Sequence, residues 1–591
     1  MRKRILSLVL TLCLLASLCA CGGEEAEPRP LYAQQGTAAR GEAGALTPAA
    51  DSEALRNCLA EAGQINTLGR ETVSPSDDRT PGKTLRIAEP DAAAKAVADG
   101  YVYMLDRYGF LVVRAAGAES EILSYSRVEL PEGIVQSRLY VQGDRAAVLC
   151  SLSEFRVDEE GLWTETAETL VVLLDLSDPA APKESGRTTL SGTLLEAGLF
   201  GEALCVVSEK SVWTLPETGT EALLPWFEED GKRTSLRPAD VYLPEAPMQA
   251  ALTLVSVLRL EDGRVLDALA LADAAEAALI EGDSLWLTRS CWTETRTEPD
   301  RERERPYTCV SYEQQANTEL LRLRYDGSLR LEGACTQEGE LTDAAALDLR
   351  DGVLRLGLQQ RRCRFTAYTD ENHGWTNYEL EEESRSSRVV ALAAELTGDG
   401  AMLDRVGGEN GVRACRFLGP FAFLATEKPG DPVYCAELSD AAPVMTGSLV
   451  LPGQTAALWL MGNDAVLVLS ESTEGDGICL SVYDGADGMR RTDRVSIQCD
   501  SPALRDWNAL LADPETGLVG LPLGGSEAEY RLYRLKDGAL KEIGSTKPEY
   551  LSEELRGFLY DGLLYLCGPA EVRVLDPETG KLLTAVSNAV G

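Results

Sequence analysis

One short phrase recurs about every fifty residues along this chain: a turn of glycine, aspartate or asparagine, followed at once by a short apolar strand. The instances are Asp99-Gly100 before YVYML, Gly143-Asp144 before RAAVL, Gly201-Glu202 before ALCVV, Gly282-Asp283 before SLWL, Asp351-Gly352 before VLRLGL, Gly419-Pro420 before FAFLA, Asn463-Asp464 before AVLVLS, Thr516-Gly517 before LVGLPL, and Asp561-Gly562 before LLYLC. A repeat of this length built from strands is typical of a radial or solenoid array. The repeat therefore constrains the fold more than any other feature.

Each repeat unit follows the same four-strand plan. One strand enters the turn and a second leaves it, a third alternates apolar residues and often ends in aspartate (TLVVLLDLSDPAAP), and a fourth closes the unit (KESGRTTL). The Asp-Pro and Asp-Gly elements between strands favour turns. Four antiparallel strands per unit describe the blade of a β-propeller, and a ring of blades escapes the size limit of a single core. We predict an all-β fold: a β-propeller of eight or nine four-stranded antiparallel blades over residues 85–591.

The first residues predict the cellular location of the protein. Three basic residues at positions 2–4 precede an apolar run over residues 5–20, which is too short for a spanning helix and ends in LCAC. This ending is similar to a bacterial lipobox, in which the last cysteine receives lipid and becomes the first residue. We expect a lipoprotein signal peptide at residues 1–20, lipid on Cys21, and an extracytoplasmic protein held on the outer face of the cell membrane. An ordinary secretory peptide or a transmembrane anchor are the alternatives.

Two segments separate the leader from the repeats. Residues 21–50 are small, polar and rich in Pro, Gly and Ala, which predicts a flexible tether. Residues 51–84 begin with Asp51 as a helix cap and place Leu55 and Leu59 on one face, which predicts one short helix followed by a loop.

Two insertions interrupt the repeats, at about residues 214–249 and 291–318. Insertions in repeat proteins tend to lie on one face, often the binding face, although inert surface loops are an equal alternative. Trp226 and Trp292 on these insertions are candidate interaction residues, because aromatic anchors dominate interfaces. Simple packing over a blade edge is the other interpretation of both tryptophans.

The excess of acidic over basic residues limits the kinds of partner that the protein can bind. The chain carries a net charge of −39 at pH 7, and loss of the leader removes three more positive charges. Such a field repels phosphate backbones, so we expect no nucleic-acid binding. The chain also lacks GxxxxGK and a GxGxxG between strand and helix, so we expect no nucleotide.

Cysteines contribute no metal pattern. Beyond the leader and Cys21, twelve are spread along the chain without a CxxC pair, and several lie in apolar strands as small hydrophobic residues. Cys291 and Cys309 bracket the second insertion, and an exported protein could join them, so they form a candidate disulfide.

The sequence contains no strong pattern of catalytic residues. The single histidine, His373, lies in a polar stretch that indicates a surface loop, and no GxSxG elbow accompanies it. Carboxylates are so frequent that their proximity carries no signal for a glycosidase, and the turn at Asp484 and Asp487 is explained more simply as a β-turn than as a calcium site. We expect no catalytic residue, no metal site and no cofactor.

The sequence resembles a family of secreted or lipid-anchored bacterial and archaeal proteins named for a C-terminal β-propeller domain distantly related to WD40 repeats. The resemblance runs from SEALRNCL to KLLTAV. It includes SRLYVQGDRAAVL followed by LVVLLDLSDPAAPKESGRTTLSG, and LLPWFEEDGKRTSLRPADVYLPEAP followed by LTLVSVLRLEDGRVL. It continues with VRACRFLGPFAFLAT and PVYCAELSDAAPVMTGSLVLPG. The family implies a propeller outside the cell and supplies no catalytic residues. The segment 361–388 is rich in charge and hard to align, which leaves the blade containing it in doubt.

These observations predict a lipid-anchored, extracytoplasmic β-propeller that is not an enzyme. We expect a binding or scaffolding module for a protein or envelope partner, with the membrane contacted through lipid on Cys21. A glycan- or peptide-binding protein using the central channel is the first alternative, and an aromatic-lined channel pocket would favour it. A hydrolase or lyase using channel carboxylates is the second, and two convergent carboxylates with raised pKa values would favour that.

Overall fold

The computed structural model describes residues 33–69, 84–86, 95–105, 109–126, 134–157, 163–216, 219–297, 307–370, 372–408, 411–428, 431–438, 443–451, 455–472, 477–524, 529–548, 555–568 and 571–587. The expected signal peptide and lipidation site at Cys21 lie outside these residues. In the described part of the chain, no helix combines the length and the apolar character needed to cross a membrane.

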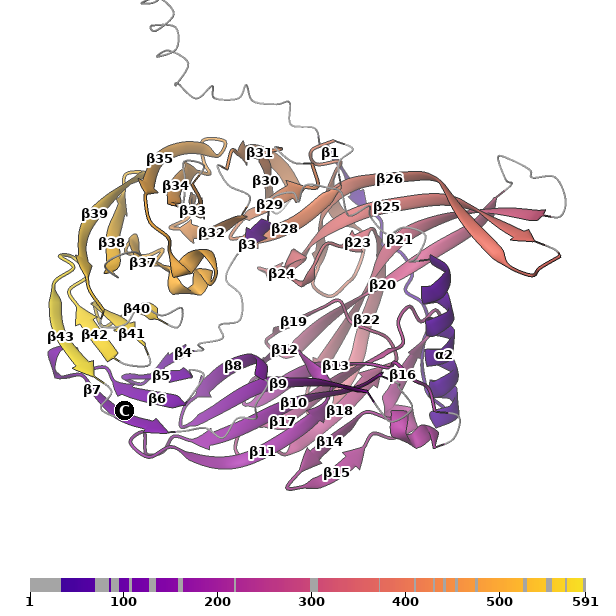
Figure 1. Ribbon diagram of the computed structural model, residues 1–591, viewed down its shortest axis with the longest axis horizontal. Coiled ribbons are helices and arrows are strands. Elements are labelled where there is room, and N and C mark those ends of the chain that lie inside the picture. Colours follow the sequence, from indigo (N-terminus) through magenta and orange to yellow (C-terminus); the bar gives the residue numbers. More distant parts are fainter. Residues whose placement is uncertain are drawn as a thin grey trace, which may run out of the picture. The chain divides into compact units, whose positions relative to one another are not determined.

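Antiparallel strands form nearly all of the described structure, which confirms the all-β prediction (Figure 1). Seven sheets each contain one four-stranded unit, and a ten-stranded sheet contains two, so the described residues form nine blades. Blades 1–3 comprise β4 (Lys95–Ala98), β5 (Tyr101–Leu105), β6 (Phe110–Arg114), β7 (Glu121–Ser126); β8 (Ile134–Gln142), β9 (Arg145–Val157), β10 (Trp163–Asp175), β11 (Lys183–Ser191); and β12 (Thr193–Phe200), β13 (Ala203–Ser211), β17 (Ala251–Arg259), β18 (Val265–Leu271).

The ten-stranded sheet contains blades 4 and 5, and the other blades follow in chain order. Blades 4 and 5 comprise β19 (Ala277–Glu281), β20 (Ser284–Thr297), β21 (Tyr307–Tyr325), β22 (Leu329–Glu338); and β24 (Leu347–Arg350), β25 (Val353–Asp370), β26 (Thr376–Ala393), β27 (Gly400–Asp404). Blades 6–9 comprise β28 (Val412–Leu418), β29 (Phe421–Thr426), β30 (Val433–Leu438), β31 (Pro443–Leu449); β32 (Thr455–Met461), β33 (Ala465–Glu471), β34 (Ile478–Asp484), β35 (Arg490–Ile497); β36 (Leu511–Ala512), β37 (Leu518–Leu523), β38 (Glu529–Lys536), β39 (Ala539–Thr546); and β40 (Arg556–Tyr560), β41 (Leu563–Cys567), β42 (Glu571–Leu575), β43 (Leu582–Ser587).

The recurring turn joins the first two strands of every blade, as its spacing predicts. In the turn between β24 and β25, Asp351 and Gly352 have φ angles of 52° and 76°. Two successive positive φ angles are typical of a type I′ turn, whose twist matches the strands that it joins. Aspartate and glycine tolerate this backbone, which explains why the phrase recurs.

Apolar side chains of each blade pack on those of the next, from blade 1 to blade 9. The circuit closes between blades 9 and 1, where Val572 and Val574 pack in one cluster with Val102 and Met104. Tyr565 supports this contact, because its hydroxyl accepts a hydrogen bond of 3.1 Å from the N–H of Gly117. Side-chain packing therefore closes the ring.

The N-terminal segment differs from the expected tether. Within residues 21–50, β1 (Gln34–Ala38) pairs with β27, and β2 (Leu46–Pro48) pairs with β16 (Val241–Pro244). The physical reason is that β27 and β16 expose an edge of unpaired main-chain groups, which the passing segment satisfies. Residues 21–32 lie outside the described part of the chain.

The predicted helix is present as α2 (Ser52–Gly69) and is longer than the sequence suggested. Asp51 accepts a hydrogen bond of 2.8 Å from the N–H of Ala54, as an N-cap does, and Leu55 and Leu59 are buried. The first turn packs against the short 3-10 helix η3 (Thr220–Leu223) through a hydrogen bond of 2.7 Å between Ser52 and Thr220.

The remaining short elements complete the sheet edges and connections. They are β3 (Thr84–Arg86), β14 (Trp226–Glu229), β15 (Lys232–Ser235), β23 (Glu340–Leu341), η2 (Gly117–Glu119), η3 (Thr220–Leu223), η4 (Pro238–Asp240), η5 (Ala344–Ala346), η6 (Pro502–Leu504) and η7 (Trp507–Ala509). The first insertion supplies β14 and β15, which extend blade 2 beyond β11, and it also supplies β16 beside β18.

The second insertion is part of a larger feature that we call the arm. The arm comprises residues 289–297 of β20, 307–316 of β21, 359–370 of β25 and 376–387 of β26. Within it β21 pairs with β25, so two long hairpins from neighbouring blades form one four-stranded sheet. Figure 1 shows these strands running past the others of their blades.

Candidate binding site on the arm

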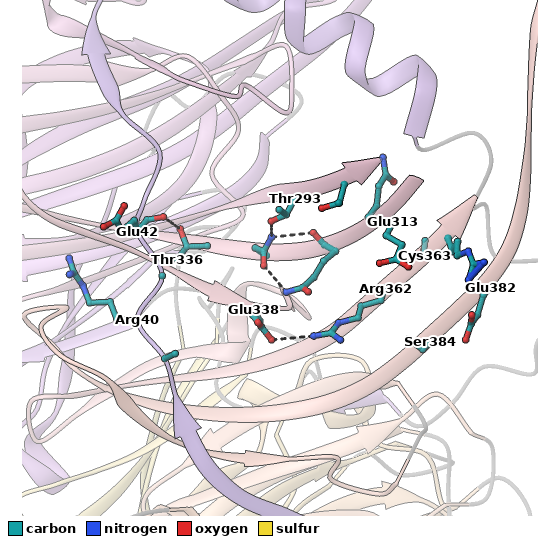
Figure 2. A pocket seen from close by; sticks show the side chains of 17 residues that line it. Arg40, Glu42, Thr293, Glu313, Thr336, Glu338, Arg362, Cys363, Glu382 and Ser384 are labelled. Carbon is teal, nitrogen blue, oxygen red and sulfur yellow. Dashed lines mark hydrogen bonds and ion pairs between the residues drawn. The ribbon is translucent and has the colours of Figure 1, made fainter. Parts of the chain in front are cut away.

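A polar pocket lies where β21 changes its partner. Asn317 is paired with Glu338 of β22, whereas Gln315, two residues earlier, is paired with Arg362 of β25. Because β22 and β25 both pair with the same side of β21, they must diverge at this point. The divergence leaves a cavity of about 730 Å³ on the sheet (Figure 2).

Polar side chains from five strands and the N-terminal segment line this cavity, which we call the arm pocket. Its lining residues are Ala39, Arg40, Gly41, Glu42, Thr293, Thr295, Glu313, Gln314, Gln315, Asn317, Thr336, Glu338, Arg362, Cys363, Arg364, Glu382 and Ser384. Hydroxyls, amides and charged groups dominate, which suits a hydrated polar ligand more than an apolar one.

Hydrogen bonds hold the floor of the arm pocket in place (Figure 2). The buried side-chain amide of Asn317 donates to the hydroxyl of Thr293 at 2.8 Å and to the carbonyl of Gln315 at 3.1 Å. The amide of Gln315 donates back to Asn317 at 3.2 Å. This network connects β20 and β21 and fixes the rotamers that face the cavity.

The charges of the arm pocket are only partly balanced. Arg362 forms an ion pair with Glu338 at 3.6 Å, and Arg364 forms one with Glu381 at 3.4 Å. In the described part of the chain, no ion pair or side-chain hydrogen bond engages the carboxylates of Glu42, Glu313 and Glu382. The groups still available to a ligand are therefore mainly acidic.

The N-terminal segment forms one wall of the arm pocket. Gly41 and Thr336 exchange main-chain hydrogen bonds of 3.0 and 3.2 Å, and the Thr336 hydroxyl donates to the carbonyl of Glu42. The guanidinium of Arg40 donates to the carbonyl of Ala334 at 2.9 Å. The pocket thus requires a segment that the sequence analysis assigned to a tether.

A buried ionic network anchors the same segment. Arg289 of β20 forms ion pairs with Glu319 and, at 2.9 Å, with Asp273, and all three side chains are buried. Glu319 also accepts a hydrogen bond of 2.7 Å from the N–H of Gly44. Nearby, burial raises the pKa of Glu209 to about 7. Glu209 lies between blades 3 and 4 and not in the arm pocket.

A second cavity of about 570 Å³ continues along the arm and shares Arg362, Glu382 and Ser384 with the arm pocket. Its remaining lining residues are Gln360, Glu383, Arg385, Ser386, Arg388, Asp404 and Arg405. Arg385 bridges Glu383 at 2.8 Å and Glu427 at 2.7 Å. The two cavities together form one polar surface on blades 4 and 5.

The two predicted interaction tryptophans lie on projecting strands but outside the arm pocket. Trp226 is half-buried in the β14–β15 hairpin, with the guanidinium of Arg233 3.4 Å from its ring centre. Trp292 lies on the arm beside Thr293, and strand alternation directs it to the opposite face, where Arg361 lies 5.7 Å from its ring. Sequence reasoning missed Trp375, which is 46% exposed at the end of the arm.

The candidate disulfide between Cys291 and Cys309 is wrong. Both thiols are free. Cys291 is opposite Asn317 on β21, eight residues from Cys309, which at about 3.4 Å per residue is roughly 27 Å away along the strand. A disulfide needs Cα atoms within about 7 Å. Nine of the other cysteines are buried, as expected for small hydrophobic residues.

His373 occupies the turn between β25 and β26, with its side chain 71% exposed and its Nδ1 3.2 Å from Asp370. This position agrees with the predicted surface loop. Among the residues that the structure describes, no cluster of three or more His, Cys, Asp or Glu side chains is arranged to hold a metal ion.

Several solved structures are similar to this chain at low identity. They are apo AztD from Citrobacter koseri (13% identity, 57% of this chain and 92% of that one, TM-score 0.27), Sqt1 from Chaetomium thermophilum (12%, 46% and 68%, 0.25) and a eukaryotic initiation factor (9%, 74% and 93%, 0.28). At these TM-scores the likenesses carry no argument about function. No curated protein matches the sequence. The family model of the beta propeller domain, however, matches residues 88–553, which include most of the nine blades. The chain therefore belongs to the beta propeller domain family.

Proposed function

We propose that this protein is a non-catalytic binding module of the bacterial cell envelope, anchored by lipid on Cys21, which recognises a protein or envelope partner at the arm pocket. The LCAC sequence at the end of the leader supports the anchor. The arm pocket carries the binding proposal. None of the described residues of the arm belongs to the apolar cluster between blades 9 and 1, so the arm is additional to the packing that closes the ring there.

The construction of the arm supports a role in recognition. β25 and β26 are 18 residues long, whereas the strands of blade 6 have six or seven. The added length builds a surface whose side chains are largely polar and whose outer strands are exposed. Functional sites of rigid scaffolds are commonly placed on such elaborations, while the repeated core supplies stability.

A capture experiment in intact cells tests this proposal. The tethered protein is cross-linked in place, and the partners retained by the wild type are compared with those of Ser384→Trp, which places a large ring at an exposed position that borders both cavities. Glu515→Trp, in an exposed turn of blade 8, is the matched control.

We expect a discrete partner to be captured by the wild type and by Glu515→Trp, and to be lost with Ser384→Trp. Capture of the same partner by all three proteins would place binding elsewhere. Cys21→Ala is expected to release the protein from the membrane fraction, and retention of this variant on the membrane would contradict the lipid anchor.

A further inference from the structure

The outer edge of β20 is open beside the arm pocket. In the described part of the chain, β19 pairs with β20 only as far as Thr288, and no other strand pairs with that side of β20. Residues 293–296 are exposed on both faces of the sheet. An open edge presents main-chain donors and acceptors to which another strand can add.

The register shows which main-chain groups face this edge. The carbonyl of Thr288 accepts a hydrogen bond of 2.8 Å from the N–H of Glu276, so Thr288 directs its main-chain groups away from β21. The pairing of β20 with β21 contains no bulge, and the direction alternates along an antiparallel strand. Trp292, Glu294 and Arg296 therefore direct their N–H and C=O groups to the open edge.

The same alternation connects the edge to the arm pocket. Thr293 and Thr295, between the edge-facing residues, line the pocket with their side chains. A strand added to β20 would place every second side chain over the same face. Glu313 is paired with Thr295 across β20 and β21, so β20 separates its carboxylate from such a side chain by two strand spacings, or roughly 10 Å. The long side chain of a lysine or arginine spans most of this distance.

Resting on the proposed function, we propose that the partner presents an extended basic segment, which adds as a strand to β20 and inserts lysine or arginine side chains into the arm pocket. Main-chain hydrogen bonds supply affinity in this mode, and pockets for alternate side chains supply specificity. Glu42, Glu313 and Glu382 attract cationic groups, and the net charge of −39 repels acidic segments.

The opposite edge of the arm, on β26, is less suited to strand addition. On β26, Glu379, Glu381 and Glu382 are exposed within four residues, and such charge density commonly protects an edge from strand addition. The β20 edge carries one acidic and one basic residue between positions 292 and 297, which balance each other. The open edge of β20 is thus the one that accepts a strand.

Labelled model peptides test the inference by fluorescence anisotropy with the intact protein near physiological salt. The probe is (Lys-Thr)6, whose lysines all lie on one face of a strand. (Lys-Pro)6 carries the same charge but lacks alternate N–H donors, and (Glu-Thr)6 reverses the charge. We expect (Lys-Thr)6 to bind at least about tenfold more tightly than either control, since a tenfold change is about 1.4 kcal/mol, the scale of one or two net hydrogen bonds.

Two pairs of variants locate the interaction. Glu294→Pro removes one N–H from the open edge without removing a donor to β21, whereas Glu294→Thr keeps that N–H. We expect the first to weaken (Lys-Thr)6 binding about tenfold and the second to leave it unchanged. Glu313→Gln is expected to weaken binding severalfold, and Glu515→Gln, an equal charge change on blade 8, is expected to have no effect.

Equal binding of (Lys-Pro)6, or full binding by Glu294→Pro, would overturn strand addition. Equal binding of (Glu-Thr)6, or an undiminished affinity of Glu313→Gln, would overturn the preference for a basic segment. Absence of (Lys-Thr)6 binding overturns the inference as a whole. In that case Ser384-dependent capture in cells would still support the proposed function, so the two failures are distinguishable.

Discussion

Replacement of Tyr565 tests whether side-chain packing between blades 9 and 1 closes the ring. Tyr565 is 1% exposed, its ring stacks on that of Phe558 at 5.6 Å, and its hydroxyl accepts from the N–H of Gly117 in blade 1. Truncation of a buried aromatic ring to alanine costs about 3–5 kcal/mol. Tyr565→Phe keeps the ring and loses only the hydrogen bond, at a cost of about 1 kcal/mol.

The change in Tm expected from these energies depends on how many residues unfold together. Unfolding entropy is about 2.1 cal/mol/K per residue, so a ring of roughly 500 residues that unfolds as one unit has an entropy near 1 kcal/mol/K. Tyr565→Ala should then lower Tm by about 4 °C, and Tyr565→Phe by about 1 °C. If blade 9 unfolded alone, with about 40 residues, the same loss would move its own transition by several tens of degrees.

Differential scanning calorimetry measures both the shift and the number of transitions. Leu583→Ala is the control, because Leu583 is on β43 of the same blade but is 42% exposed, and exposed substitutions stay within about 0.5 kcal/mol. Equal Tm values for Tyr565→Ala and Leu583→Ala, or a separate transition at low temperature in Tyr565→Ala, would refute closure through this contact.

Three further predictions concern Glu209, Arg289 and the two cysteines of the arm. Burial raises the pKa of Glu209 from 4.5 to about 7, so the folded state holds a proton that the unfolded chain releases, and the wild type loses stability as pH rises through that window. The Tm of Glu209→Gln should therefore rise relative to that of the wild type between about pH 4 and about pH 8. A difference in Tm between the two proteins that does not change with pH would contradict the raised pKa of Glu209 as the cause. Arg289→Met leaves two buried carboxylates without their cation and should cost about 3–5 kcal/mol, measurable as a fall in Tm of a few degrees; an unchanged Tm would show that the network does not stabilise the fold. Cys291 and Cys309 should both be alkylated in denaturant without a reductant, and a peptide joining them in mass spectrometry would contradict the register of the arm.

The repeated elements were predictable from the sequence because their signals are local. Each Asp-Gly or Gly-Asp turn fixes its own backbone through positive φ angles, and each apolar run marks a buried strand on both sides of that turn. The helix after Asp51 was predictable for the same reason, since a cap and an apolar face need no distant partner.

The arm was not predictable, because its strands depend on distant partners. Residues 361–388 contain charged side chains on both faces, and the apolar alternation of Cys363, Phe365 and Ala367 is too short to predict a strand of 18 residues. β1 forms on the edge of β27, some 360 residues away, and its own sequence, QQGTA, has little strand preference. The wrong disulfide has a similar origin, because the distance between Cys291 and Cys309 follows from strand register and not from sequence separation.

Site-specific photo-cross-linking in cells tests the central claim most directly. A photoreactive amino acid is placed at Thr295, which is exposed at the arm pocket, and in a second protein at Glu515, which is exposed on blade 8. We predict a discrete cross-linked partner from position 295 that is absent from position 515 and that is lost when Glu294→Pro is added. The same products from both positions, or none from position 295, would contradict recognition at the arm.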